Sequence, residues 1–287
     1  MKKLTIFALV FCCMFFIFNF TSVHASQSNP SLQIVTTLPL AKNIVQKIAG
    51  DQIAVNSIIN GSNCEHEYEP SAKNMKMIAK CDLFVKIGME ADHWADKLTG
   101  IIKKQAIIID CSQGVQTIKV RGFVNPHYWS NPNNVKIMAK NILDHLIKIK
   151  PSQKNYFSKN YDKYLTEIDT TINSLKIQVK TLRNKKLVSY SNAFPYLFES
   201  FSFENLMTVE LSCEQEVSPK DLVQAVKIIK TQKIKILVGD AAEPKEPETL
   251  SKESQTKLIL LWPTTDASGD YLTTLKNNIN LMVAALK

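Results

Sequence analysis

One predicted element restricts the fold of this chain more than any other: a helix of roughly 30 residues near its middle. Apolar side chains recur there at steps of three and four, which places them on one face of a helix. The stripe consists of Phe157, Tyr161, Tyr164, Leu165, Ile168, Ile172, Leu175, Val179 and Leu182. The predicted helix, Ser152–Arg183, would span ~45 Å, the width of a small domain. A coiled coil also needs a long stripe, but a single isolated helix is better explained as a spine between two lobes.

On both sides of this spine, β-rich runs alternate with helical stretches, as in parallel sheets covered by helices. Before the spine, we expect strands at Gln33–Thr37, Gln52–Ile59, Asp82–Ile87 and Ala106–Asp110, and helices at Leu40–Ala49, Ser71–Lys80, Asp92–Ile102 and Asn133–Ile149. After it, we expect strands at Lys186–Tyr190, Leu206–Leu211, Ile234–Gly239 and Lys257–Trp262, and helices at Ala193–Phe201, Ser218–Lys230, Pro247–Lys252 and Tyr271–Leu286.

The predicted fold class is therefore α/β, with two lobes of parallel sheet flanked by helices and joined by one long spine helix. The expected organisation is a signal peptide at 1–25, an N-terminal α/β lobe at 26–151, a linking helix at 152–184 and a C-terminal α/β lobe at 185–287.

The first 25 residues have the features of a secretory signal peptide. Lys2-Lys3 precedes an apolar run at Leu4–Phe20, and Val23-His24-Ala25 offers small residues at the usual cleavage positions. The apolar run is about 17 residues long, at the short limit for a membrane-spanning helix. We therefore expect cleavage after Ala25 and a mature protein in the periplasm.

The charge of the mature chain does not indicate a nucleic-acid partner. Without Lys2 and Lys3 it keeps 33 basic and 26 acidic side chains, a net charge of +7. The basic residues are scattered, whereas nucleic-acid proteins usually gather them in a stripe or patch. We expect a monomer that binds no nucleic acid.

Cysteine usage leaves two alternatives open. Lipid attachment at Cys12 or Cys13 is disfavoured, because the bulky Phe11 precedes them. The mature chain has four cysteines, which allow three pairings in an oxidising compartment: Cys64, Cys81, Cys111 and Cys213. The pair Cys64 and Cys213, each in a loop after a strand of a different lobe, could bind a metal as thiolates or tie the lobes together as a disulfide. The other alternative is that these two cysteines have no shared role or pair separately.

Four histidines remain in the mature chain, and two of them are candidate metal ligands. His145 lies within a predicted helix and His93 at a helix start, where neither position requires a histidine. His66 and His127 instead lie in loops of the first lobe, His66 after a strand and His127 after an irregular segment, Ser112–Pro126. Ligands of parallel α/β sheets bind at loops that follow strands. Because lone histidines are often structural, this placement alone is weak support.

The sequences around these two histidines resemble a known family. They read Glu65-His66-Glu67-Tyr68-Glu69-Pro70 and Asn125-Pro126-His127-Tyr128-Trp129-Ser130-Asn131-Pro132. Both are similar to the histidine segments of zinc- and manganese-binding solute-binding proteins of ABC transporters. Further similar segments are Pro39-Leu40-Ala41, Gly88-Met89, Trp94–Leu98, Val217-Ser218-Pro219 and Gly269–Leu272, so that the resemblance covers nearly all of Gln33–Leu286.

The resemblance implies that the chain is not an enzyme but captures Zn²⁺, or Mn²⁺, as transported ligand and delivers it to a membrane permease with its ATPase subunit.

Two departures from the family pattern concern the second lobe. Ser191 stands where relatives have a His or Glu, and Trp262 stands where they have an Asp. Since neither side chain suits zinc, Asp266 is the third predicted metal ligand, with Glu216 as a further candidate. In the first lobe, Glu65 replaces the usual proline.

Two other functions fit the sequence less well. A diverged relative could have lost metal transport and bind another solute or partner, because both second-lobe ligands are replaced. A two-histidine metallohydrolase would need a general base and an open metal position. The chain has no His-Glu-x-x-His or Gly-x-Ser-x-Gly motif and no phosphate-binding glycine loop, and it holds only 8 glycines.

Overall fold

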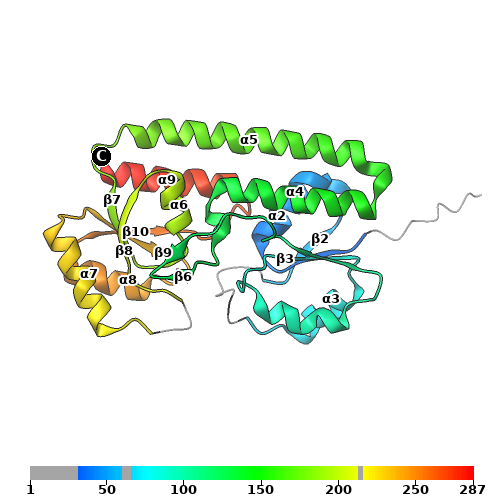
Figure 1. Cartoon of the computed structure of the whole chain (residues 1–287), viewed down its shortest axis with the longest axis horizontal. Coiled ribbons are helices and arrows are strands. Elements are labelled where there is room, and N and C mark those ends of the chain that lie inside the picture. The colour runs from blue at the N-terminus through cyan, green and yellow to red at the C-terminus, as the bar shows by residue number, and fades with distance from the viewer. Residues whose placement is uncertain (1–31, 60–65, 67, 213–215) are drawn as a thin grey trace, which may run out of the picture. The chain divides into compact units, whose positions relative to one another are not determined.

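Two parallel sheets of four strands each form the frame of the protein (Figure 1). The computed structural model describes residues 32–59, 66, 68–212 and 216–287. Strand order is β2-β1-β3-β4 in the first sheet and β10-β9-β7-β8 in the second, and every paired strand within them is parallel. The strands are β1 (Ile34–Thr36), β2 (Val55–Ser57), β3 (Leu83–Lys86), β4 (Ile107–Asp110), β7 (Lys186–Ser189), β8 (Glu204–Thr208), β9 (Ile236–Asp240) and β10 (Lys257–Leu261).

Helices cover both faces of each sheet. We use first lobe for the first sheet with α2, α3, η2 and α4, and second lobe for the second sheet with α6, α7, α8 and α9. The α-helices are α2 (Pro39–Ala49), α3 (Ala72–Lys80), α4 (Pro132–Ile149), α5 (Lys154–Lys180), α6 (Pro195–Ser200), α7 (Pro219–Thr231), α8 (Lys245–Ser254) and α9 (Tyr271–Leu286). Short 3₁₀ helices are η1 (Gly50–Gln52), η2 (His93–Ile101), η3 (Tyr128–Ser130) and η4 (Pro151–Gln153).

The second sheet shows how strand alternation builds two apolar layers. Successive side chains of a strand point to opposite faces. Ile236 and Val238 of β9 accordingly join the large core, whereas Leu237 between them joins a separate cluster with Ala225 and Ile229 of α7. The four buried positions of this strand, Ile236–Gly239, carry no polar side chain, because helices cover both faces.

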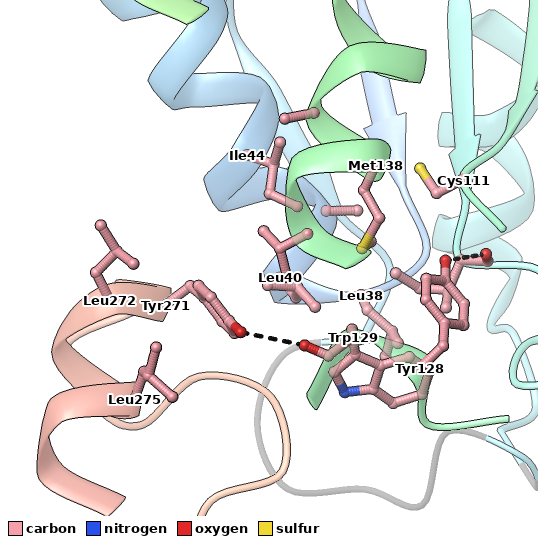
Figure 2. Packing of buried hydrophobic residues seen from close by; sticks show 14 of the residues in the cluster. Leu38, Leu40, Ile44, Cys111, Tyr128, Trp129, Met138, Tyr271, Leu272 and Leu275 are labelled. Carbon is pink, nitrogen blue, oxygen red and sulfur yellow. Dashed lines mark hydrogen bonds between the residues drawn. The ribbon is translucent and has the colours of Figure 1, made fainter. Parts of the chain in front are cut away.

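The large core is continuous from the first lobe to the second. It contains residues of the first sheet, one face of the second sheet, and the buried face of α5. Helix α5 packs against α2 and α4 of the first lobe and against α9 of the second. Figure 2 shows Tyr271, Leu272 and Leu275 of α9 beside side chains of the first lobe.

The predicted fold class is confirmed, including the long joining helix. The buried residues of α5 follow the predicted stripe, with Thr171 added to it. The boundaries of the domains stay predictions, although Leu32–Lys287 forms one unit by its contacts. Residues 1–31, with the expected signal peptide, lie outside the described residues. Within the described residues, no helix is both long and apolar enough to cross a membrane.

Two local predictions were wrong. The segment Ser112–Pro126, expected to be irregular, holds the antiparallel hairpin β5 (Lys119–Val120) and β6 (Phe123–Val124). Its turn places Arg121 and Gly122 at positive φ, as in the tight turns that suit hairpins. The strand expected at Leu206–Leu211 begins two residues earlier, at Glu204, beside an irregularity in its pairing with β7. The helix expected at Asp92–Ile102 is present as the 3₁₀ helix η2.

The stripe of α5 gives a test with a matched control on the same helix. Ile168 is fully buried, whereas 67% of Ile177 is exposed. Replacing Ile168 by Ala should lower the free energy of unfolding by about 2–5 kcal/mol, because it leaves a cavity in the shared core. Replacing Ile177 by Ala should change it by less than about 0.5 kcal/mol. Denaturant unfolding measures both, and equal losses would contradict the packing described.

Candidate metal centre

The loop that carries His127 is fixed by hydrogen bonds in two directions. The Tyr128 hydroxyl donates to the carbonyl of Ile87 at the end of β3, at 2.7 Å (Figure 2). The Trp129 indole donates to the carbonyl of Pro263 at 2.9 Å, and the Ser130 hydroxyl donates to that of Ala193 at 2.7 Å. The first bond attaches the loop to the first sheet, and the other two attach it to the second lobe. His127 therefore sits on a segment with little freedom to move.

The position of His127 itself follows from the turn that precedes it. The side-chain oxygen of Asn125 accepts from the backbone N–H of His127 at 2.9 Å, which is the pattern of an Asx turn. The same oxygen lies 2.9 Å from Nδ1 of the His127 ring. One buried amide thus holds both the backbone and the imidazole of this histidine.

His66 lies next to His127 in space. Their ring centroids are 5.4 Å apart, with the planes nearly perpendicular at 78°. Two imidazole nitrogens on one tetrahedral zinc ion are about 3.3 Å apart, since each Zn–N bond is ~2.0–2.1 Å. Adjacent rings from two separate loops are the arrangement that such a pair requires.

Both histidines line one cavity of about 680 Å³. Glu90 and His93 belong to the same wall, and the hairpin contributes Val120, Phe123 and Val124. The second lobe contributes Asn192, Leu211 and Ser212. The cavity is thus bounded by residues of both lobes, and sequence analysis missed His93, Glu90 and Asn192 as members of its wall.

His127 is held in the uncharged form that binds metals. Burial, with a smaller contribution from the neighbouring His66, lowers the pKa of His127 to about 3. At neutral pH the His127 imidazole is therefore neutral, and one of its two ring nitrogens carries a lone pair instead of a proton. A cation can bind this ring without competition from protons.

Comparison with known proteins identifies the family. Residues 34–285 match the family described as ZnuA, zinc-uptake complex component A, periplasmic. The chain belongs to the ZnuA family. Proteins of this family are substrate-binding components of metal ABC transporters and not enzymes, so the chain acts outside the cytoplasm with a permease and an ATPase as partners. The resemblance found in the sequence is confirmed.

Similar ZnuA-family proteins carry names with different metals. The iron-binding protein YfeA of Yersinia pestis is 25% identical over 260 residues, which are 86% of this chain and 83% of that protein. The manganese ABC transporter substrate-binding lipoprotein PsaA of Streptococcus mitis is 26% identical over 88% of this chain and 87% of its own length. A crystal structure of a ZnuA deletion mutant with zinc bound has a TM-score of 0.82 at 23% identity, covering 90% of this chain and 98% of its own. The metal of the present chain does not follow from these names.

The structure does not bring the predicted second-lobe ligands to the histidine cavity. The Asp266 carboxylate accepts from the Ser268 backbone N–H and from the Asn277 side chain, each at 2.9 Å, and Asp266 is absent from the cavity lining. Glu216 lines a different cavity. Among the residues that the structure describes, no three His, Cys, Asp or Glu side chains are grouped closely enough to hold one ion.

Of the four cysteines, two can be placed. Cys81 and Cys111 are buried and free, so neither takes part in a disulfide. Cys64 and Cys213, the pair predicted to bind metal or to link the lobes, lie outside the described residues.

The cavity that Glu216 lines is acidic. It measures about 690 Å³ and lies where β7, β8 and β9 end, with Glu210, Glu243 and Glu246 in its wall. Burial is the main reason that the pKa of Glu210 rises to about 7, and Glu243, Asp240 and Glu246 raise it further. Glu210 therefore holds a proton in the folded protein at pH values where an ordinary glutamate has lost it.

This shift predicts how stability depends on pH. Between the ordinary pKa of 4.5 and about 7, the folded state binds a proton that the unfolded state has released. Stability from this group is therefore fully present below pH 4.5 and is lost as the pH rises to 7. Glu210→Gln should match wild type in melting temperature below this window and exceed it above. Thermal unfolding on both sides of the window measures the difference, and an equal shift on both sides would contradict the assignment.

Proposed function

We propose that the chain captures a divalent cation, with zinc favoured, between His66 and His127 and carries it to the permease of its transporter. The observation that supports this most strongly is the contact between the two rings, 5.4 Å between centroids, in the wall of one cavity. Membership of the family supports the transport function, and the adjacent rings support His66 and His127 as the ligands.

The type of donor atom favours zinc over manganese. Imidazole suits zinc, copper, iron and nickel, whereas manganese prefers carboxylate, carbonyl and water oxygens. His127 offers a neutral ring nitrogen, and its partner Asn125 meets the usual requirement that the other ring nitrogen of a metal-bound histidine be hydrogen-bonded.

Two imidazoles do not complete a zinc site, since even open sites keep about three protein ligands. Asp266 is our proposed third ligand. Its carboxylate is half-buried at the end of the second lobe, where Ser268 and Asn277 donate to it. Because Asp266 does not line the histidine cavity, binding the same cation would require it to give up these hydrogen bonds and move into that cavity.

Calorimetric titration of the mature protein with zinc and manganese tests the proposed ligands. Wild type should bind zinc more tightly than manganese. His66→Ala and His127→Ala should each remove most of the affinity, because each leaves one imidazole to hold the ion. His145→Ala is the matched control: its ring Nδ1 pairs with the Asn141 carbonyl on α4, so affinity should not change.

The variant Asp266→Ala tests whether the site includes Asp266 as third ligand. A loss of affinity comparable to that of the histidine variants would support Asp266 as third ligand, and unchanged affinity would remove it from the site. If wild type binds neither metal below millimolar concentration, metal capture fails as the function. The chain would then be a diverged relative that binds another solute or partner.

We also propose that the mature protein begins at Ser26 and acts in the periplasm. The basis is the charged start, the apolar run and Val23-His24-Ala25. N-terminal sequencing of the exported protein should read Ser26 first. Retention of Met1, or a lipid on Cys12 or Cys13, would contradict it.

A further inference from the structure

The side chain of Asn125 contacts both the backbone and the ring of His127, and this contact indicates the tautomer of the imidazole. The backbone N–H of His127 is always a donor, so the Asn125 atom that it meets at 2.9 Å has to be the amide oxygen. The same oxygen faces Nδ1 of the ring at 2.9 Å. Because an amide oxygen only accepts, Nδ1 carries the hydrogen and Nε2 keeps its lone pair.

The other half of the Asn125 amide reaches the second lobe. Its nitrogen donates to the backbone carbonyl of Asn192 at 2.9 Å and to the Asn192 side-chain oxygen at 3.0 Å. The Asn192 nitrogen in turn donates to the carbonyl of Leu211 at 2.8 Å. Asn192 and Leu211 both line the cavity that His127 lines. A chain of hydrogen bonds therefore runs from the imidazole, through Asn125, to the opposite wall.

The surroundings leave Asn125 no alternative orientation. The residue is fully buried, and the Tyr196 hydroxyl donates to its backbone carbonyl at 2.8 Å. If the amide were flipped, its nitrogen would face the His127 N–H and its oxygen would face the Asn192 carbonyl, so that donors would meet donors and acceptors would meet acceptors.

We propose that Asn125 is the positioning residue of the metal centre: it fixes His127 as the Nδ1–H tautomer, which leaves the lone pair for the cation on Nε2, and it couples this ring to the second-lobe wall of the cavity. This proposal rests on the proposed function for its metal-binding consequence. Hydrogen-bond partners of metal-bound histidines hold the ring and its tautomer, and their loss typically costs ~10–100-fold in metal affinity.

The first experiment is independent of metal. Nitrogen NMR of ¹⁵N-histidine-labelled, metal-free mature protein reports the tautomer, with the His127 signal assigned by its loss in His127→Ala. Wild type should show a protonated Nδ1 and a bare Nε2. Asn125→Asp should show the same at a pH well above the ordinary imidazole pKa, because a carboxylate oxygen also accepts from Nδ1. Asn125→Ala should shift population to the Nε2–H tautomer.

The second experiment measures zinc affinity by calorimetry in the same variants. Asn125→Ala should lose ~10–100-fold, and Asn125→Asp should lose less than Asn125→Ala, because it keeps an acceptor for Nδ1 although it loses the donor to Asn192. Asn134→Ala is the matched control. Asn134 is another buried amide of this region, which donates to the carbonyls of Tyr128 and Gln116 and has no bond to the imidazole. It should leave the tautomer unchanged and affect affinity less than Asn125→Ala.

The outcomes separate this proposal from the proposed function. A wild-type tautomer in Asn125→Ala, or equal affinity losses in the Asn125→Ala and Asn134→Ala variants without recovery in Asn125→Asp, would overturn the positioning role. If wild type binds no zinc, the proposed function fails while the NMR result still decides whether Asn125 sets the tautomer. Should Asn125→Ala not fold, Asn125→Asp decides alone: a shifted tautomer would contradict the proposal.

Discussion

Burial of the apolar face of α5 is the constraint on which the arrangement of the lobes depends. The helix has 27 residues, and its buried positions run from Phe157 to Val179. No single sheet of four short strands could cover a stripe of that length, since the helix extends ~40 Å. Helices α2 and α4 cover it from the first lobe and α9 covers it from the second, which makes one core out of two lobes. The relative position of the two sheets is thus determined far from the cavity.

Close to the cavity, polar contacts fix the positions of individual side chains more closely than apolar packing does. Hydrogen bonds are directional, whereas hydrophobic contacts are not. The loop before α4 uses Asn125, Trp129 and Ser130 to reach the second lobe at two places, the consecutive residues Asn192 and Ala193 and, further along the chain, Pro263. Since His127 lies between these residues, its ring is placed by the same bonds that hold the lobes together near the cavity. The loop that carries His127 is therefore also a contact between the two lobes.

The sequence predicted the fold well because its signals were long and periodic. One atypical residue does not obscure a pattern as long as the α5 stripe or the alternation of strands with helices. The hairpin at Lys119–Val124 was missed because two strands of two residues give no periodic pattern, and Phe123 and Val124 are exposed rather than buried. The two histidines were found from the segments around them. Asn125 and Asn192 could not be found, because their roles arise from contacts between residues 67 positions apart.

The placement of α9 has a consequence for when the protein can fold. The backbone N–H of its residue Tyr271 donates to the side-chain oxygen of Asn43. The Tyr271 hydroxyl donates to the Trp129 carbonyl (Figure 2). Leu286, near the last residue of the sequence, belongs to the same apolar cluster as Ile34. During synthesis the N-terminal parts of a chain emerge first. The shared core therefore cannot close before α9 is available to pack against the first lobe, so its folding depends on contacts between residues as far as 228 positions apart.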